Sequence, residues 1–187
     1  MEQKRILLAS PRGFCAGVAR AVAAVEETLR ICGAPVYVKH EIVHNRHVVA
    51  DLERKGAITI EMLSEAPEGS VVVFSAHGSP RAHYEEARER KVTLIDATCP
   101  LVTKVHLELL RYLKEGYRVL YIGHRGHIEG VGVLGEAPDE EIPIIETVSD
   151  VDRLDFGNPE KLVYLTQTTL SIDETADIIA ALKGKYP

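Results

Sequence analysis

Asp-Ala-Thr-Cys-Pro-Leu-Val-Thr-Lys, residues 96–104, decides the fold because it joins a strand to a helix. The residues before it, Val92–Ile95, form the apolar run of a buried strand, and residues 100–114 have helical spacing. Proline is well accepted in the first turn of a helix. The pattern therefore predicts a strand that leads into a helix, with Cys99 at the start of that helix.

A second cysteine stands in the same position relative to a strand and a helix. Residues 11–17 read Pro-Arg-Gly-Phe-Cys-Ala-Gly and follow the apolar run Ile6–Ala9, which is predicted as a strand. A helical pattern from Val18 to Ile31 comes next. A thiol at the positive end of a helix loses its proton more easily than a free thiol. Cys15 and Cys99 are therefore candidate nucleophiles or metal ligands.

Strand-like and helical segments alternate along the rest of the chain. Further strands are expected at residues 35–38, 57–60, 70–75, 118–122, 143–146 and 161–165, and further helices at residues 45–54, 81–91 and 172–183. Such alternation is typical of proteins in which helices cover parallel sheets. We expect an α/β fold of repeated small units with mostly parallel sheets. The first unit is expected over residues 1–96 and the second over residues 97–187.

The composition argues against several classes of function. The chain has 187 residues and a formal net charge of −6, whereas nucleic-acid-binding proteins carry clustered Lys and Arg. The sequence has no apolar run long enough for a signal peptide core or a membrane span. Its three cysteines lack the regular spacing of a disulfide framework. We therefore expect a cytoplasmic protein without a nucleic-acid or membrane partner.

Polar residues follow the predicted strands, at the edge where ligands bind in open α/β sheets. Histidines at such an edge bind phosphate oxygens, bind metals or move protons. A carboxyl group beside them suits a proton donor, and hydroxyl groups suit the positioning of a substrate alcohol. The candidate residues are His44, His77, His127, Glu129, Gln167, Thr168 and Thr169.

Other residues of the same kinds have simpler interpretations. Four histidines lie on predicted helices or at outer positions and are expected to be surface or capping residues: His40, His47, His83 and His106. Cys32 is expected to be a small buried hydrophobic residue near the end of the first helix.

Five runs together resemble the LytB/IspH family of 4-hydroxy-3-methylbut-2-enyl diphosphate reductases. They are Pro-Arg-Gly-Phe-Cys-Ala-Gly-Val (residues 11–18), His-Glu-Ile-Val-His-Asn (40–45), Phe-Ser-Ala-His-Gly (74–78), Asp-Ala-Thr-Cys-Pro-Leu-Val-Thr-Lys-Val-His (96–106) and Thr-Gln-Thr-Thr-Leu-Ser (166–171). The resemblance extends from about residue 5 to the end of the chain. It implies a trefoil-like fold of three α/β units, of which this chain is expected to form two.

The resemblance also implies an activity. Members of this family are iron–sulfur oxidoreductases that act at the last step of the non-mevalonate isoprenoid pathway. An allylic alcohol diphosphate takes up two electrons, loses its hydroxyl as water and gives isopentenyl and dimethylallyl diphosphates. A ferredoxin- or flavodoxin-type protein is the expected electron donor.

The roles of individual residues follow from the same resemblance. Cys15 and Cys99 are expected to be two of the three cysteine ligands of a 4Fe–4S cluster. Glu129 is the expected proton donor, and Thr168 is expected to order the substrate hydroxyl. The remaining expected substrate-binding residues are His44, His77, His127, Gln167 and Thr169, with His127 also linked to proton delivery.

The chain departs from the family pattern in two places. Where the family has Gly-His-Pro-Glu followed by Val-x-Gly-Thr, residues 126–133 read Gly-His-Ile-Glu-Gly-Val-Gly-Val. The chain also ends at Pro187, whereas the family continues into a third unit with a third cluster cysteine and a Ser-x-Asn segment. We therefore expect an incomplete cluster site, and a chain that is inactive alone or complemented by a C-terminal partner chain.

Two other functions stay open at this point. The chain could be a diphosphate-binding module without redox chemistry. A metal-dependent phosphohydrolase built on His44, His77, His127 and Glu129 is the weaker alternative. It assigns no role to the two cysteine runs and has no known metal-ligand spacing.

Overall fold

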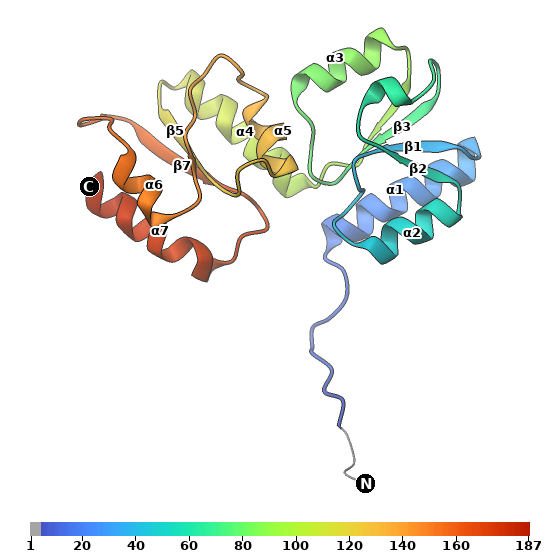
Figure 1. Ribbon diagram of the computed structural model, residues 1–187, viewed down its shortest axis with the longest axis horizontal. Coiled ribbons are helices and arrows are strands. Elements are labelled where there is room, and N and C mark those ends of the chain that lie inside the picture. Colours follow the sequence, from blue (N-terminus) through green and yellow to red (C-terminus); the bar gives the residue numbers. More distant parts are fainter. Residues whose placement is uncertain (1–4) are drawn as a thin grey trace.

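The computed structural model describes residues 5–187, and Figure 1 shows two sheets, each covered by helices. The first sheet contains β1 (Val36–Lys39), β2 (Ala57–Ile60), β3 (Val71–Phe74) and β4 (Thr93–Asp96), in the order β2-β1-β3-β4. The second contains β5 (Arg118–Ile122), β6 (Ile144–Ile145) and β7 (Leu162–Thr166), in the order β6-β5-β7. All neighbouring strands are parallel, so the predicted α/β fold with parallel sheets is confirmed.

The helices connect the strands and cover the sheets. They are α1 (Ala16–Cys32), α2 (Arg46–Arg54), α3 (Arg81–Glu89), α4 (Pro100–Lys114), α5 (Ile128–Leu134), α6 (Val148–Arg153) and α7 (Ile172–Lys185), with one 3-10 turn at Leu63–Glu65. Their ends follow from local chemistry. Pro100 stands in the first turn of α4, and the Asn45 side chain accepts hydrogen bonds from two backbone N–H groups at the start of α2. In the described residues no helix has the length and apolar character needed to cross a membrane.

Each sheet buries both of its faces, because successive side chains of a strand point to opposite sides. In β3, Val73 packs in the cluster beneath α1 and α2, whereas Val72 and Phe74 pack on the face covered by α3. In β5, Leu120 and Ile122 pack against α6 and α7, whereas Val119 and Tyr121 face α4 and α5. The continuous apolar runs of these strands follow from this double coverage.

The prediction of a strand at Ile6–Ala9 is wrong. This segment has no regular structure and extends away from the rest of the molecule (Figure 1). Ile6 and Leu7 are 87% and 84% exposed. A strand needs a neighbour for its backbone hydrogen bonds, and no strand of residues 5–187 pairs with this segment.

Two short helices, α5 and α6, were not expected from the sequence. α5 has seven residues and contains Gly130 and Gly132, which are poor helix formers. The division of the chain into units over residues 1–96 and 97–187 stays a prediction.

Candidate functional site

The site lies where each sheet reverses its strand order. In the first sheet, β1 leads to β2 on one side and β3 leads to β4 on the other, so the order changes between β1 and β3. Ligands of open α/β sheets bind at the carboxyl ends of the strands at such a point. His44 follows β1 and His77 follows β3, and their ring centroids are 4.1 Å apart. The topology of the sheet therefore brings these two histidines together.

The second sheet adds a third histidine to this pair. Its order changes between β5 and β7, and His127 follows β5. The ring centroid of His127 lies 5.2 Å from that of His44 and 6.0 Å from that of His77. The histidine cluster, His44, His77 and His127, therefore spans both sheets. A cavity beside it is lined by His44 and His127.

Burial disfavours the protonated form of two members of the histidine cluster. Burial, followed by the charges of His44 and His127, lowers the pKa of His77 to about 4. Burial is also the main cause that lowers the pKa of His127. The backbone N–H of Glu129 donates to Nδ1 of His127 at 3.1 Å, so the proton of the neutral ring is assigned to Nε2. An anion in the cluster would meet imidazole N–H groups and would favour their protonated forms.

Glu129 lies in the first turn of α5 and is 1% exposed. Its Oε1 accepts a hydrogen bond from the Thr168 backbone N–H at 2.7 Å, and its Oε2 accepts from Thr168 Oγ1 at 2.8 Å. Glu129 follows β5 and Thr168 follows β7, so this contact joins the two segments that leave the second sheet where its strand order reverses. Burial raises the pKa of Glu129, although the two hydrogen bonds from Thr168 oppose the shift. A buried carboxyl group of this kind is suited to hold and release a proton.

Gln167 is buried and connects the ends of β5 and β7 through hydrogen bonds. Its Oε1 accepts from the His124 backbone N–H at 3.0 Å, and its backbone N–H donates to the Ile122 carbonyl at 2.8 Å. Its Nε2 donates to Thr169 Oγ1 at 2.7 Å. Both polar ends of the Gln167 side chain are therefore occupied by the protein itself, and Thr169 is exposed beside it.

Cys15 and Cys99 converge from different helices. Each is the residue immediately before a helix, α1 for Cys15 and α4 for Cys99, and neither side chain caps its helix. A methyl group placed on Gly17 would lie 2.6 Å from the Cys99 sulfur and 3.9 Å from the Cys15 sulfur. The two thiols therefore share one small region, which Gly17 keeps open.

Cys32 does not join this pair. It is the last residue of α1, so the length of that 17-residue helix, about 25 Å, separates it from Cys15. The prediction that Cys32 is buried is wrong, because the end of α1 leaves its thiol exposed. Among residues 5–187 no group of three or more His, Cys, Asp or Glu side chains is arranged to hold a metal ion.

The four histidines with simple interpretations differ from one another. His47 is exposed, and His40 pairs with Glu61 at 2.8 Å. His106 is instead 8% exposed and lies on the buried face of α4 with Val102 and Leu109. The expectation of a surface or capping residue is therefore wrong for His106. The spacing of four and three residues from its apolar neighbours is the helical signal that could have identified it.

The departures from the family pattern fit the structure around α5. Ile128 is the first residue of α5, a position where proline is also favoured, so the helix begins there without the proline. Val133 is fully buried beside Leu109 and Val119, where an apolar side chain packs well. Gly130 lies against the ring of Tyr121.

Comparisons with known proteins agree with this architecture. The sequence profile described as LytB protein matches residues 6–187. A 4-hydroxy-3-methylbut-2-enyl diphosphate reductase from Chlamydia trachomatis serovar D is 56% identical over 184 residues, which cover 98% of this chain and 60% of that protein. A protein of the same name from Streptomyces coelicolor is 55% identical over 184 residues and is covered to 54% of its length.

A solved structure gives the same result. The E-1-hydroxy-2-methyl-but-2-enyl-4-diphosphate reductase from Plasmodium falciparum superposes with a TM-score of 0.90 and 48% sequence identity. The superposition covers 94% of this chain and 55% of that structure. The chain thus spans between about half and three fifths of the length of the relatives it matches. From its sequence profile, its curated relatives and its fold, the chain belongs to the LytB family.

Proposed function

We propose that this chain forms the diphosphate-binding and proton-donating part of a 4-hydroxy-3-methylbut-2-enyl diphosphate reductase. The overall reaction joins the allylic alcohol diphosphate with two electrons and two protons. One proton leaves with the hydroxyl as water. The other is added to one or the other end of the three-carbon allyl unit, and the position of this addition decides which of the two products forms. The observation that carries the proposal is the meeting of the histidine cluster with the buried Glu129–Thr168 pair across two sheets.

The histidine cluster would bind the diphosphate. A diphosphate needs several hydrogen-bond donors, and charge-assisted bonds to phosphate oxygens are among the stronger ones. The assigned Nε2–H of His127 is one donor, and the close rings of His44 and His77 offer others. Because the pKa of His77 is low without a ligand, we expect the diphosphate to raise it and binding to take up protons.

Glu129 would supply a proton to the reacting end of the substrate. Its carboxyl group holds a proton more readily than an exposed one, because burial raises its pKa. The Thr168 hydroxyl, 2.8 Å from Oε2, would order the substrate alcohol beside that carboxyl group. Turning the hydroxyl from donor to acceptor would let it follow the protonation state of Glu129.

Cys15 and Cys99 would hold a 4Fe–4S cluster. Thiolates are the usual protein ligands of such clusters, and the two sulfurs lie around one point above Gly17. The bound cluster would supply electrons and a Lewis-acidic iron. Residues 5–187 bring two thiols to this place, so a further ligand would have to come from another segment or partner chain. A ferredoxin- or flavodoxin-type protein would donate the electrons.

A second candidate function is a diphosphate-binding module without redox chemistry. One observation favours it. The histidine cluster is assembled from residues of this chain, whereas the thiol site brings together only two cysteines within residues 5–187.

Two measurements separate these functions. The first is calorimetric binding of inorganic diphosphate to the chain, with sulfate as the control anion. The second is anaerobic iron–sulfur reconstitution, alone and with the C-terminal part of a relative, followed by assay of allylic diphosphate reduction. For the reductase we expect diphosphate binding, iron uptake with the complement, and an at least ~100-fold loss of reduction in Glu129→Gln with diphosphate binding retained.

Each contrary outcome has a distinct meaning. Diphosphate binding without iron uptake in the presence of the complement supports the binding module. The absence of diphosphate binding refutes both functions.

A further inference from the structure

His106 is a buried side chain that the proposed reaction does not use. It lies on α4 and is 8% exposed. Its Nδ1 lies 2.8 Å from Oε1 of Glu136, just after α5, and the Glu136 side chain is only 16% exposed. Because Nδ1 faces a carboxylate, it carries a proton, and Nε2 is buried without a protein partner among the described residues.

The Nε2 side of the His106 ring lies against Gly78, the residue after His77. A methyl group placed on Gly78 would lie 2.8 Å from Nε2 of His106 and 3.1 Å from Cγ1 of Val102. Gly78 also has a φ of +80°, which favours glycine. The loop after β3 therefore rests directly on the inner face of α4.

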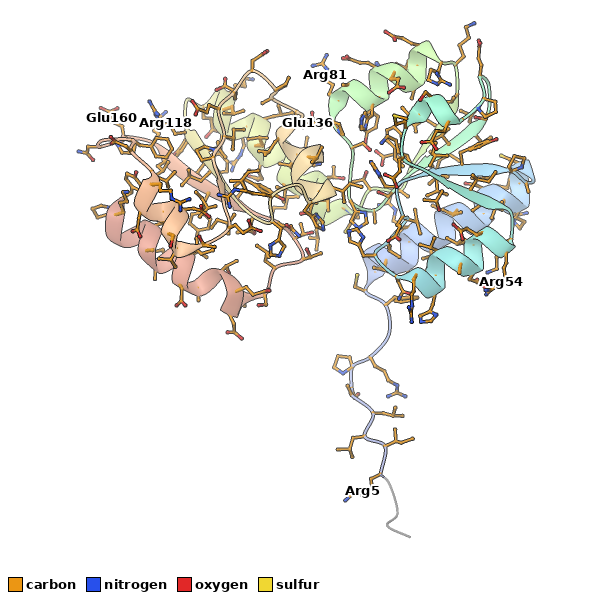
Figure 2. All side chains as sticks on the ribbon, in the orientation of Figure 1. Arg5, Arg54, Arg81, Arg118, Glu136 and Glu160 are labelled. Atoms are coloured by element: carbon orange, nitrogen blue, oxygen red, sulfur yellow. The ribbon has the colours of Figure 1, made fainter. Side chains whose placement is uncertain are left out.

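The helix α5 closes on the same loop, residues 78–80, from another side. A methyl group placed on Gly132 would lie 3.3 Å from the carbonyl carbon of Gly78. One placed on Gly135 would lie 2.3 Å from Cβ of Pro80. Glycine at both positions lets the backbone of α5 reach the loop. Figure 2 shows Glu136 close to Arg81, the first residue of α3, and the two residues line one cavity.

We propose that His106 and Glu136 form a clamp that holds loop 78–80 against α5 and thereby fixes His77 relative to His127 and Glu129. The loop begins next to His77, and α5 begins next to His127 and contains Glu129. The hydrogen bond to Glu136 prevents the His106 ring from turning away, and the ring packs against Gly78. His106 is thus a positioning residue, and its functional meaning rests on the proposed diphosphate pocket.

The test is the titration of His77, followed by the imidazole resonances in NMR spectra of the full chain. In His106→Phe a ring remains but the bond to Glu136 is lost. We expect that loop 78–80 is then held less firmly, so that His77 becomes more exposed and lies farther from His127. The pKa of His77 then rises from about 4 toward 6.5. Affinity for inorganic diphosphate is expected to fall about tenfold, within the range found for disturbed coupling between sites.

His83→Phe is the matched control. His83 also has a buried nitrogen without a partner, but its ring packs on Phe74 beneath α3 rather than on α5. We expect this variant to leave the His77 titration unchanged. A His77 pKa that stays at about 4 in His106→Phe, with only a lower unfolding temperature, would overturn the clamp.

A second variant keeps the test decisive if His106→Phe does not fold. His106→Asn retains a donor for Glu136 but withdraws the ring from Gly78. The same rise in the pKa of His77 supports the clamp, and an unchanged value refutes it. If the unmodified chain does not bind inorganic diphosphate, the proposed function fails, and the His77 titration still decides whether the clamp exists.

Discussion

Replacing Thr168 by valine isolates the hydrogen bond that holds the buried carboxylate of Glu129. Valine has the shape of threonine and keeps the backbone N–H that donates to Oε1 at 2.7 Å, but it removes the hydroxyl that donates to Oε2 at 2.8 Å. A hydrogen bond to a charged group contributes about 1.5–3 kcal/mol to stability. Because Thr168 is exposed while Glu129 is buried, we expect the lower end, about 1.5 kcal/mol.

This loss should depend on pH. Burial already raises the pKa of Glu129 above its ordinary value, and removing a donor to the charged form raises it further. A carboxyl group with a raised pKa binds its proton more tightly in the folded state, so it lowers stability as the pH rises through that pKa. The Thr168→Val variant is therefore most destabilised at neutral pH and least destabilised in acid.

The assay is urea denaturation followed by circular dichroism, at neutral pH and at a pH where Glu129 is protonated. In thermal unfolding at neutral pH, the same loss of about 1.5 kcal/mol would lower the unfolding temperature by about 3–6 °C. The double variant with Glu129→Gln is the control, because valine should then cause a smaller loss. An equal loss at both pH values, or in both backgrounds, refutes the assignment of this bond to an ionised carboxyl group.

Three further predictions each concern a single residue. Gly17→Ala should keep the fold by circular dichroism but reduce iron uptake on anaerobic reconstitution with a complement, since its methyl group would lie 2.6 Å from the Cys99 sulfur; full uptake would contradict the shared thiol site. Tyr121→Phe should leave stability to urea unchanged or raise it by up to about 1 kcal/mol, because the buried hydroxyl has no protein partner among the described residues; a clear loss would reveal a partner. Burial lowers the pKa of His77, so inorganic diphosphate should bind more tightly as the pH falls from about 8 to about 6. Calorimetry in two buffers should then detect proton uptake on binding. An affinity that does not depend on pH would argue against imidazole donors.

The elements of the fold could largely be predicted because their signals are local. The apolar runs of β1, β3 and β5 and the helical spacing of α4 lie within a few residues of one another. Pro100 even gives the first residue of α4. The strand expected at Ile6–Ala9 failed for the opposite reason. A strand also needs a neighbour, and an apolar run carries no information about whether one is present.

The meeting of the site residues could be predicted only in part. Parallel strands bring their carboxyl ends to one edge, so the closeness of His44 and His77 follows from the order of the first sheet. The contact between Glu129 and Thr168 joins residues 39 positions apart, and Glu129 lies in α5, a short helix that the sequence did not reveal. No local pattern records such a contact.

The feature of the site that the sequence predicts least is the arrangement of residues at the border of the two sheets. The histidine cluster takes His44 and His77 from one sheet and His127 from the other, so its geometry depends on how closely the sheets approach. Gly132 and the ring of His106 both lie against Gly78 at this border. A sequence pattern marks them only as a weak helix former and as a histidine on a helix. Neither residue needs to touch a ligand to matter. If the histidine cluster binds a diphosphate, the side chains that determine its affinity include those that pack the two sheets together. The search for functional residues in this family therefore has to extend from the strand ends to that border.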